Sequence, residues 1–380
     1  MLIEASAIRG NPRPNRGKGI LLKRRKTMAT SDNKEPLKIT LADLAHVVVP
    51  EAGPSPTLPS EVAGARSYGT IAEAADKAPV VAEERGSFLL QGWFYLGAAG
   101  LLGAIVGWGL CERGFTDGEL RRWGNFWIIP AIITFMCIGF GIAESLVERS
   151  VRKALLRGVL AIPLGILLGF IFEFMANTIY TIGLSLCAGA GVQSYRNPAV
   201  WIARGIAWAV FGAAGGIVYG IVGQSAKKAK YGILGGLIGA CIGGMVFDPI
   251  SMATKGGSMS RAVGFALVGV ATGVGMGLVE SALKDRWLYV TAGPLAGKQF
   301  ILYKALTTLG SQQQSDIYLF KDPNILPQHA VIATSGSRIQ LKALGAAYVG
   351  GSPVHTRVLQ DGDLLQIGRY AFRYKERHRG

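Results

Sequence analysis

Two carboxylates are notable in this sequence because each lies inside an apolar stretch. Glu173 ends the segment GFIFE and Asp248 ends GMVFD, so each lies four residues after a glycine and directly after a phenylalanine. An acidic side chain within a membrane is costly unless it is paired or hydrated, and such residues often line ion or proton paths. One hypothesis is a path lined by both carboxylates. The interpretation we favour is that each marks the outer end of a span or pairs with Arg204.

The other reactive residue types do not form a catalytic or metal-binding pattern. The sequence contains no HExxH, no GxSxG and no His/Cys spacing typical of a metal site. The cysteines are Cys111, Cys137, Cys187 and Cys241, without CxxC spacing, and the histidines are His46, His329, His355 and His378. The glycine run GLIGACIGG lacks the Lys-Ser/Thr that completes a phosphate-binding loop. We therefore expect no enzyme, no catalytic residue, no metal and no cofactor.

The positions of Glu173 and Asp248 depend on a long apolar region between residues 88 and 285. Six segments in it have the roughly 20 apolar residues that cross a bilayer. They are residues 88–110, 126–143, 156–185, 199–222, 231–252 and 262–283. Glycines recur every three or four positions, above all in 231–252, and let neighbouring membrane helices approach closely. The sequence predicts a glycine-rich, all-α polytopic bundle, whose third span is so long that we expect tilt, a kink at Pro163 or an exit from the membrane.

Basic loops orient the predicted spans, since Lys and Arg are retained on the cytoplasmic side. They follow the second, fourth and sixth spans, with Arg149, Arg152, Lys153 and Arg157, then Lys227, Lys228 and Lys230, then Lys284 and Arg286. This places both termini in the cytoplasm, in a bacterial inner (plasma) membrane. The net charge of +16 is thereby explained without nucleic acid. Similar span ends, GIAES, GIVGQS and GLVES, indicate repeated helical hairpins whose polar ends cap and interlock the helices.

The first 87 residues carry no sustained periodicity and are rich in Pro, Ala, Ser and charged residues. Such a composition favours disorder, so we predict a basic, disordered cytoplasmic tail. Met28 is an alternative start, which leaves open whether translation begins at Met1 or Met28.

Residues 286–380 have a different pattern, with short alternating segments separated by Gly, Pro, Asp and Ser. Examples are WLYVT, HAVIA, RIQLK and DLLQIG. Many short strands at such intervals predict an all-β sandwich. The fold class is thus multidomain, with a membrane bundle of about six helices followed by a β-sandwich.

This last region resembles a forkhead-associated (FHA) domain. The resemblance lies in GPLAGKQFIL, TTLGS, SDIYLFKDPNILPQHAVI, AAYVGGSPV and LQDGDLLQIGRYAFRY, about a quarter of the chain. It implies a phosphothreonine-binding sandwich whose loops contact the peptide. Glycine-rich membrane segments followed by such a domain also resemble a bacterial family with no assigned activity.

The family's binding positions map onto residues that lack its usual chemistry. Gly310-Ser311 replaces the family's Gly-Arg, and Leu326-Pro327-Gln328-His329 replaces Ser-Arg-x-His. Gly345-Ala346-Ala347 replaces the Asn-Gly-Thr turn. A phosphate dianion needs arginines or converging donors. The resemblance therefore implies a degenerate module, with Ser311, Leu326, Gln328, His329, Gly345 and Ala346 as its binding positions. We expect His329 to brace the loop, and Arg338 or Lys342 to replace the lost donors only if they face it.

The sequence as a whole predicts a membrane-anchored scaffold or signalling adaptor that binds proteins through its cytoplasmic FHA-like domain. The alternative is a channel or transporter regulated by that domain. The expected partners are proteins at the cytoplasmic face, phosphoproteins among them, and membrane lipid, with no nucleic acid. Homo-oligomers are compatible with this sequence.

Overall fold

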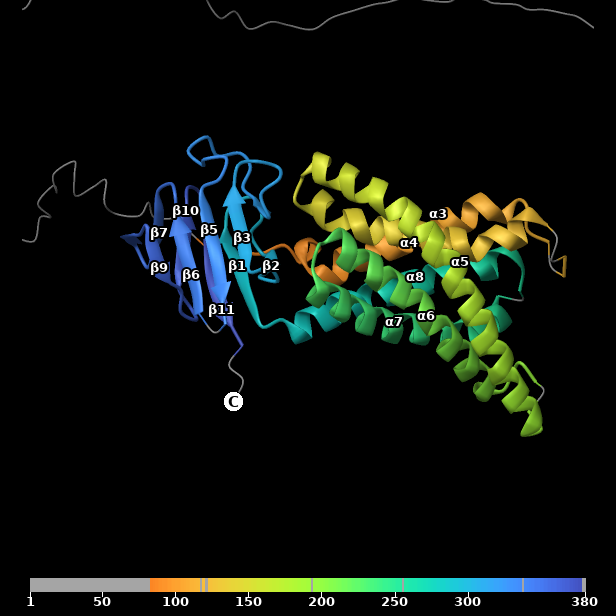
Figure 1. Ribbon diagram of the computed structural model, residues 1–380. Helices are drawn as coiled ribbons and strands as arrows, with labels where there is room; N and C mark the ends of the chain where they lie inside the picture. The colour runs from red at the N-terminus through yellow and green to blue at the C-terminus, as the bar shows by residue number, and fades with distance from the viewer. Residues whose placement is uncertain are drawn as a thin grey trace, which may run out of the picture. The chain divides into compact units, whose positions relative to one another are not determined.

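The computed structural model describes residues 83–377, apart from positions 117, 120, 121, 193, 255 and 337 (Figure 1). Most of the predicted disordered tail lies outside the described residues. Its last part, 83–87, contacts the sandwich, since Glu84 N donates to Thr291 O at 2.8 Å and Ser87 N donates to Ala296 O at 3.3 Å. These five residues therefore belong with the sandwich rather than with the tail.

Six long helices occupy the predicted membrane region, after a short 3₁₀ turn, η2 (Phe88–Leu90). They are α3 (Gly92–Glu112), α4 (Trp123–Val147), α5 (Val151–Gly189), α6 (Pro198–Val222), α7 (Ala226–Ala253) and α8 (Gly257–Leu283). All six are long and apolar enough to cross a membrane. The helices extend past most of the predicted apolar spans, because hydropathy marks only the apolar centre of a helix.

The helices form a closed ring in which each packs on the next and α3 packs on α8. Glycines allow this close packing: Gly212 of α6 faces Gly236 of α7, and Gly100 of α3 faces Gly269 of α8. A Cβ atom at any of these four positions would overlap the neighbouring backbone. The ring of Phe140 from α4 is fully buried beside Gly100. Around Phe140 and Gly100, the interior of the bundle is thus filled by side chains.

Helix α5 differs from the others in length. It has 39 residues and continues through Pro163. At 1.5 Å per residue it is about 58 Å long, whereas the hydrocarbon core of a bilayer is about 30 Å thick. The predicted third span is therefore a single helix that continues through Pro163, and its length is compatible with the expected tilt, kink or exit from the membrane.

Two sheets form the C-terminal sandwich (Figure 1). The first has the order β2 (Gln299–Ile301), β1 (Arg286–Ala292), β11 (Tyr370–Glu376), β10 (Leu364–Ile367), β7 (Ala347–Val349) and β8 (Ser352–Pro353). The second has the order β4 (Ile317–Tyr318), β3 (Leu306–Gly310), β5 (Ala330–Ser335), β6 (Arg338–Ala343) and β9 (Thr356–Val358). Among the described strands, only β3 and β4 pair in parallel.

The core of the sandwich follows from alternation along these strands. In β6 exposed and buried residues alternate without interruption, so Ile339 and Leu341 point inward. They pack with inward residues of the other sheet, including Val290 and Phe372, in a cluster separate from that of the helices. The predicted fold class, helical bundle followed by β-sandwich, is confirmed.

Candidate functional site

Three loops of the sandwich meet around the side chain of His329, which is 2% exposed. Its Nδ1 accepts a hydrogen bond from Leu326 N at 3.1 Å, and its Nε2 lies 3.0 Å from Ala346 O. A backbone N–H facing Nδ1 and a carbonyl facing Nε2 require the neutral ring with its proton on Nε2. His329 thus joins the β4–β5 loop to the β6–β7 loop, and both ring nitrogens are already bonded.

The hydroxyl and backbone amide of Ser311 are also bonded within the loops. Ser311 Oγ donates to Ile325 O at 2.8 Å, and Ser311 N donates to Leu326 O at 3.0 Å. Gly345 lies against the His329 ring, where a Cβ would overlap the imidazole. The fold brings these positions together, but the Ser311 hydroxyl and the His329 ring are already bonded inside the protein.

The candidate positions on the outer face of these loops are uncharged. Leu326 is 44% exposed, and Gln328 and Ala346 are also exposed. Of the two cations considered as replacements, Arg338 pairs with Ser335 at the far end of β6, whereas Lys342 lies near the loop end. The fold therefore places Lys342 near the loops and Arg338 far from them.

The predicted intramembrane residues divide into a pair and an isolated carboxylate. Arg204 Nε lies 2.8 Å from Asp248 Oδ2, and Arg204 Nη2 donates to Tyr180 Oη at 2.8 Å. Asp248 is 8% exposed, so the pair is almost buried. Glu173 is partly buried and has no hydrogen-bond or ion-pair partner within the part of the chain that the structure describes. The structure therefore joins Arg204 to Asp248 but not Glu173 to Asp248, and a shared ion path stays a prediction.

The polar span ends interlock, as the sequence predicts. Glu144 of α4 accepts from Lys228 Nζ at 2.6 Å and from Arg157 Nη1 at 3.1 Å, linking α4 to α7 and α5. Ser225 caps α7 by accepting from Lys228 N at 3.2 Å. Glu280 of α8 accepts from Tyr219 Oη of α6 at 3.1 Å. These contacts fasten the five helix ends that carry the basic loops or lead into the sandwich.

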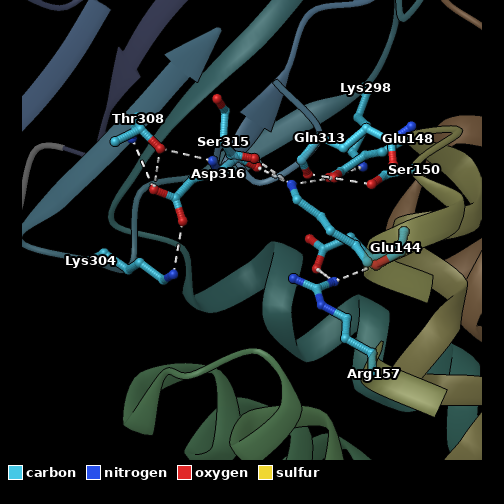
Figure 2. A network of polar contacts seen from close by, with 12 residues as sticks. Glu144, Glu148, Ser150, Arg157, Lys298, Lys304, Thr308, Gln313, Ser315 and Asp316 are labelled. Carbon is cyan, nitrogen blue, oxygen red and sulfur yellow. Dashed lines mark hydrogen bonds and ion pairs between the residues drawn. The ribbon is translucent and has the colours of Figure 1, made fainter. Parts of the chain in front are cut away.

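A second polar network joins these helix ends to the sandwich, which belongs to the same compact unit (Figure 2). Lys298, from the β1–β2 connection, places Nζ 2.8 Å from Glu148 Oε1, and their side chains are 1% and 3% exposed. Lys153 Nζ donates to the carbonyls of Ser315 and Asp316. The β3–β4 loop, which carries Ser311, is thus fastened to the start of α5.

Two further groups strengthen this junction. Burial would raise the pKa of Asp316, but hydrogen bonds from Lys304 Nζ at 2.8 Å and from Thr308 outweigh it and hold the pKa below its ordinary range. Burial, together with the nearby Glu280 carboxylate, raises the pKa of Tyr303 well above its ordinary value. Tyr303 is therefore a hydrogen-bond donor, and its hydroxyl donates to Glu280.

Sequence reasoning missed the junction. Lys298 and Glu148 are 150 positions apart, and no local pattern marks either as a partner of the other. Only the motif that places Glu144 and Glu280 at span ends pointed to this region. Within the described residues, no three His, Cys, Asp or Glu side chains group to hold a metal ion.

Comparisons with known proteins converge on the sandwich. The model of the FHA domain family matches residues 307–368. The glycogen accumulation regulator GarA of Mycolicibacterium smegmatis is 36% identical over 86 residues, 22% of this chain and 54% of the relative. The oxoglutarate dehydrogenase inhibitor of Corynebacterium efficiens is 35% identical over 86 residues, 22% of this chain and 60% of the relative. The chain spans about half the length of the curated relatives it matches.

A solved structure is similar over the same region. The FHA domain of the CT664 protein from Chlamydia trachomatis is 25% identical, with a TM-score of 0.23, and the match covers 25% of this chain and all of that one. A second solved structure, from a structural and functional analysis of phosphothreonine-dependent FHA domain interactions, is 21% identical with a TM-score of 0.23, over 25% of this chain and 99% of that one. The C-terminal part of this chain is therefore an FHA domain, preceded by six helices that are long and apolar enough to span a membrane.

Proposed function

We propose that this protein is a membrane-anchored scaffold or signalling adaptor that docks a partner protein on the loops of its FHA domain. The observation that carries the proposal is the loop face around His329, which is exposed at Leu326, Gln328 and Ala346 but braced from within. A rigid, neutral surface suits contact with a protein, because little side-chain entropy is lost on binding.

The partner is recognised without strong dependence on phosphothreonine. Ser311, Leu326 and Gly345 occupy the positions where the family has arginine, serine and asparagine. A phosphate dianion is normally held by charge-assisted hydrogen bonds, and the Ser311 hydroxyl and the His329 ring are already bonded to backbone carbonyls. Recognition then depends on the shape of the loop face and on contacts with Leu326 and Gln328.

The anchor is the helical bundle, placed in the inner membrane with both termini and the FHA domain in the cytoplasm. Lys153 and Lys228 support this orientation, because they lie in the first turns of α5 and α7, within the basic segments after α4 and α6, at the end of the bundle that contacts the sandwich. Retention of basic loops in the cytoplasm then puts the FHA domain on the same side. The junction with Lys298 holds the domain at the membrane surface, with its loop face available.

Site-specific photo-crosslinking in the native membrane tests the docking face. A crosslinking amino acid at Gln328 should capture a discrete partner, whereas the same group at Arg338 should not. Both positions are exposed, but Arg338 begins β6 at the far end of the sheet. Equal capture at both positions, or capture at Arg338 alone, would contradict the proposal.

A matched pair of substitutions provides the control. Leu326→Ser should weaken capture, while Val358→Ser should leave it unchanged. The two side chains are similarly exposed, at 44% and 50%, and Val358 lies in the edge strand β9. If both variants capture the partner as the unmodified chain does, Leu326 takes no part in docking.

A further inference from the structure

A cavity of about 330 Å³ lies where the helix ends meet the sandwich. Its walls come from α4, α5 and α7 on one side and from the β2–β4 region on the other. It is separate from the loop face around His329, and neither the docking of a partner nor the anchoring of the chain makes use of it.

One wall of this cavity is apolar and reaches the outer surface of α5. Leu156 and Leu160 line the cavity and are 62% and 46% exposed. Exposed leucines on a membrane span contact lipid chains, because the hydrocarbon phase has no polar groups to satisfy. The apolar wall is therefore continuous with the lipid-facing surface, at the end of α5 that carries the basic loop.

The polar part of the lining carries more positive than negative charge. Its charged residues are Lys153, Arg157, Lys228, Lys304, Glu144, Glu148 and Asp316. Glu144 is shared by two of these cations, and Glu148 is shared by Lys153 and the neighbouring Lys298. When the neighbouring Lys298 and Glu280 are added to this lining, five cations face four carboxylates.

Two of these cations keep donors for a further ligand. Within the described residues, both hydrogen bonds that Arg157 donates leave from Nη1, toward Glu144 and Ser145, so the Nε and Nη2 donors remain. Lys304 donates to Asp316 and its side chain is still 36% exposed. Figure 2 shows Arg157 and Lys304 on opposite sides of the junction, one from each wall.

We propose that this cavity binds the phosphate headgroup of an anionic phospholipid, with its acyl chains against Leu156 and Leu160. Arg157 and Lys304 contact the phosphate from the two walls, and the ligand supplies the missing negative charge. Charge-assisted hydrogen bonds of this kind are stronger than neutral ones. The inference rests on the membrane placement proposed above. The lipid would bridge the helices and the FHA domain.

Lipid binding to the purified full-length chain tests this proposal. The chain is delipidated in detergent and titrated with phosphatidylglycerol, phosphatidylcholine or inorganic phosphate, while native mass spectrometry counts bound lipid and thermal unfolding reports stabilisation. We expect saturable binding of one phosphatidylglycerol per chain, with a rise in Tm, and no comparable effect of phosphatidylcholine. If inorganic phosphate alone reproduces the rise in Tm, the ligand is a soluble anion and the lipid proposal fails.

Matched variants locate the site. Arg157→Gln should weaken phosphatidylglycerol binding about tenfold, as expected for one lost hydrogen bond to a charged group. Arg152→Gln removes the same charge from an exposed position of the same helix and should change binding by less than about twofold. Because Arg157 also bonds Glu144, Lys304→Gln provides a second variant, with the exposed Lys342→Gln as its control. Equal losses in variant and control would overturn the site.

Membrane extraction separates this proposal from the one on which it rests. A chain that stays in carbonate-washed membranes but shows no preference for phosphatidylglycerol refutes the lipid site alone. A chain that washes off the membranes refutes both the anchor and the site.

Discussion

Because Lys298 and Glu148 form a buried ion pair, we predict that a single substitution at Lys298 will release the sandwich from the helices. Lys298→Met leaves Glu148, 3% exposed, without its partner at 2.8 Å. Breaking a buried pair from one side costs about 3–5 kcal/mol. Lys153 Nζ remains 3.6 Å from Glu148, so we expect the lower limit, about 3 kcal/mol. This corresponds to a roughly hundredfold increase in the population of the undocked state.

Hydrogen–deuterium exchange of the full chain in detergent measures this opening directly, because exchange reports local as well as global unfolding. Peptides covering residues 147–154 and 311–318 should exchange roughly a hundredfold faster in Lys298→Met. Lys298→Met/Glu148→Leu should recover most of the protection, since both members of the buried pair are removed and Lys153 keeps its hydrogen bonds to the carbonyls of Ser315 and Asp316.

The control is a lysine in an exposed pair. Lys375 Nζ lies 3.8 Å from Asp361, and the two side chains are 39% and 32% exposed. An exposed pair contributes about 0–1 kcal/mol, so Lys375→Met should leave the exchange of both peptides nearly unchanged. If Lys298→Met and Lys375→Met exchange alike, the buried pair does not hold the sandwich and the reasoning is refuted.

Three further predictions concern the loops, the junction and the membrane region. Gly345→Ala should lower the free energy of unfolding by about 1–3 kcal/mol, because the new Cβ overlaps the His329 ring. An unchanged Tm would contradict this, because it would mean that the loops move apart without cost. The lowered pKa of Asp316 makes this carboxylate stabilising above its ordinary value of 3.8, and that stability is lost as the pH falls below it. Asp316→Asn should therefore flatten the acid limb of a Tm-against-pH profile, and an unaltered limb would contradict this. Arg204→Gln should destabilise by about 3–5 kcal/mol, whereas Arg204→Gln/Asp248→Asn should recover most of the loss in the same thermal assay; equal losses would mean that the pair is not formed.

The fold was largely predictable because its signals are local. Hydropathy located all six helices, and alternation located the strands around Ile339 and Leu341. The third predicted span already ran through Pro163, and α5 continues past this proline because packing on neighbouring helices can outweigh the hydrogen bond that proline removes. The contact of residues 83–87 with Thr291 was not predictable, because a composition that favours disorder does not indicate which surface such a segment contacts.

The candidate site was predictable only in part. The resemblance to FHA domains located the loop positions, and the pairing of Asp248 with Arg204 was one of the alternatives considered. The junction was not found, since Lys298 is one of 40 basic residues and its partner lies 150 positions away. Contacts between two regions with separate cores depend on how their surfaces meet, which no periodicity in the sequence encodes.

The claim that the loops bind a partner without strong dependence on phosphothreonine is tested most directly by a peptide titration. The full chain in nanodiscs is titrated with matched phosphothreonine and unphosphorylated peptide libraries, and the two sets of Kd values are compared. We predict no peptide whose binding becomes micromolar only when its threonine is phosphorylated. Micromolar, phosphate-dependent binding that is lost in Lys342→Gln would show that another cation has replaced the missing arginine, and it would contradict this account.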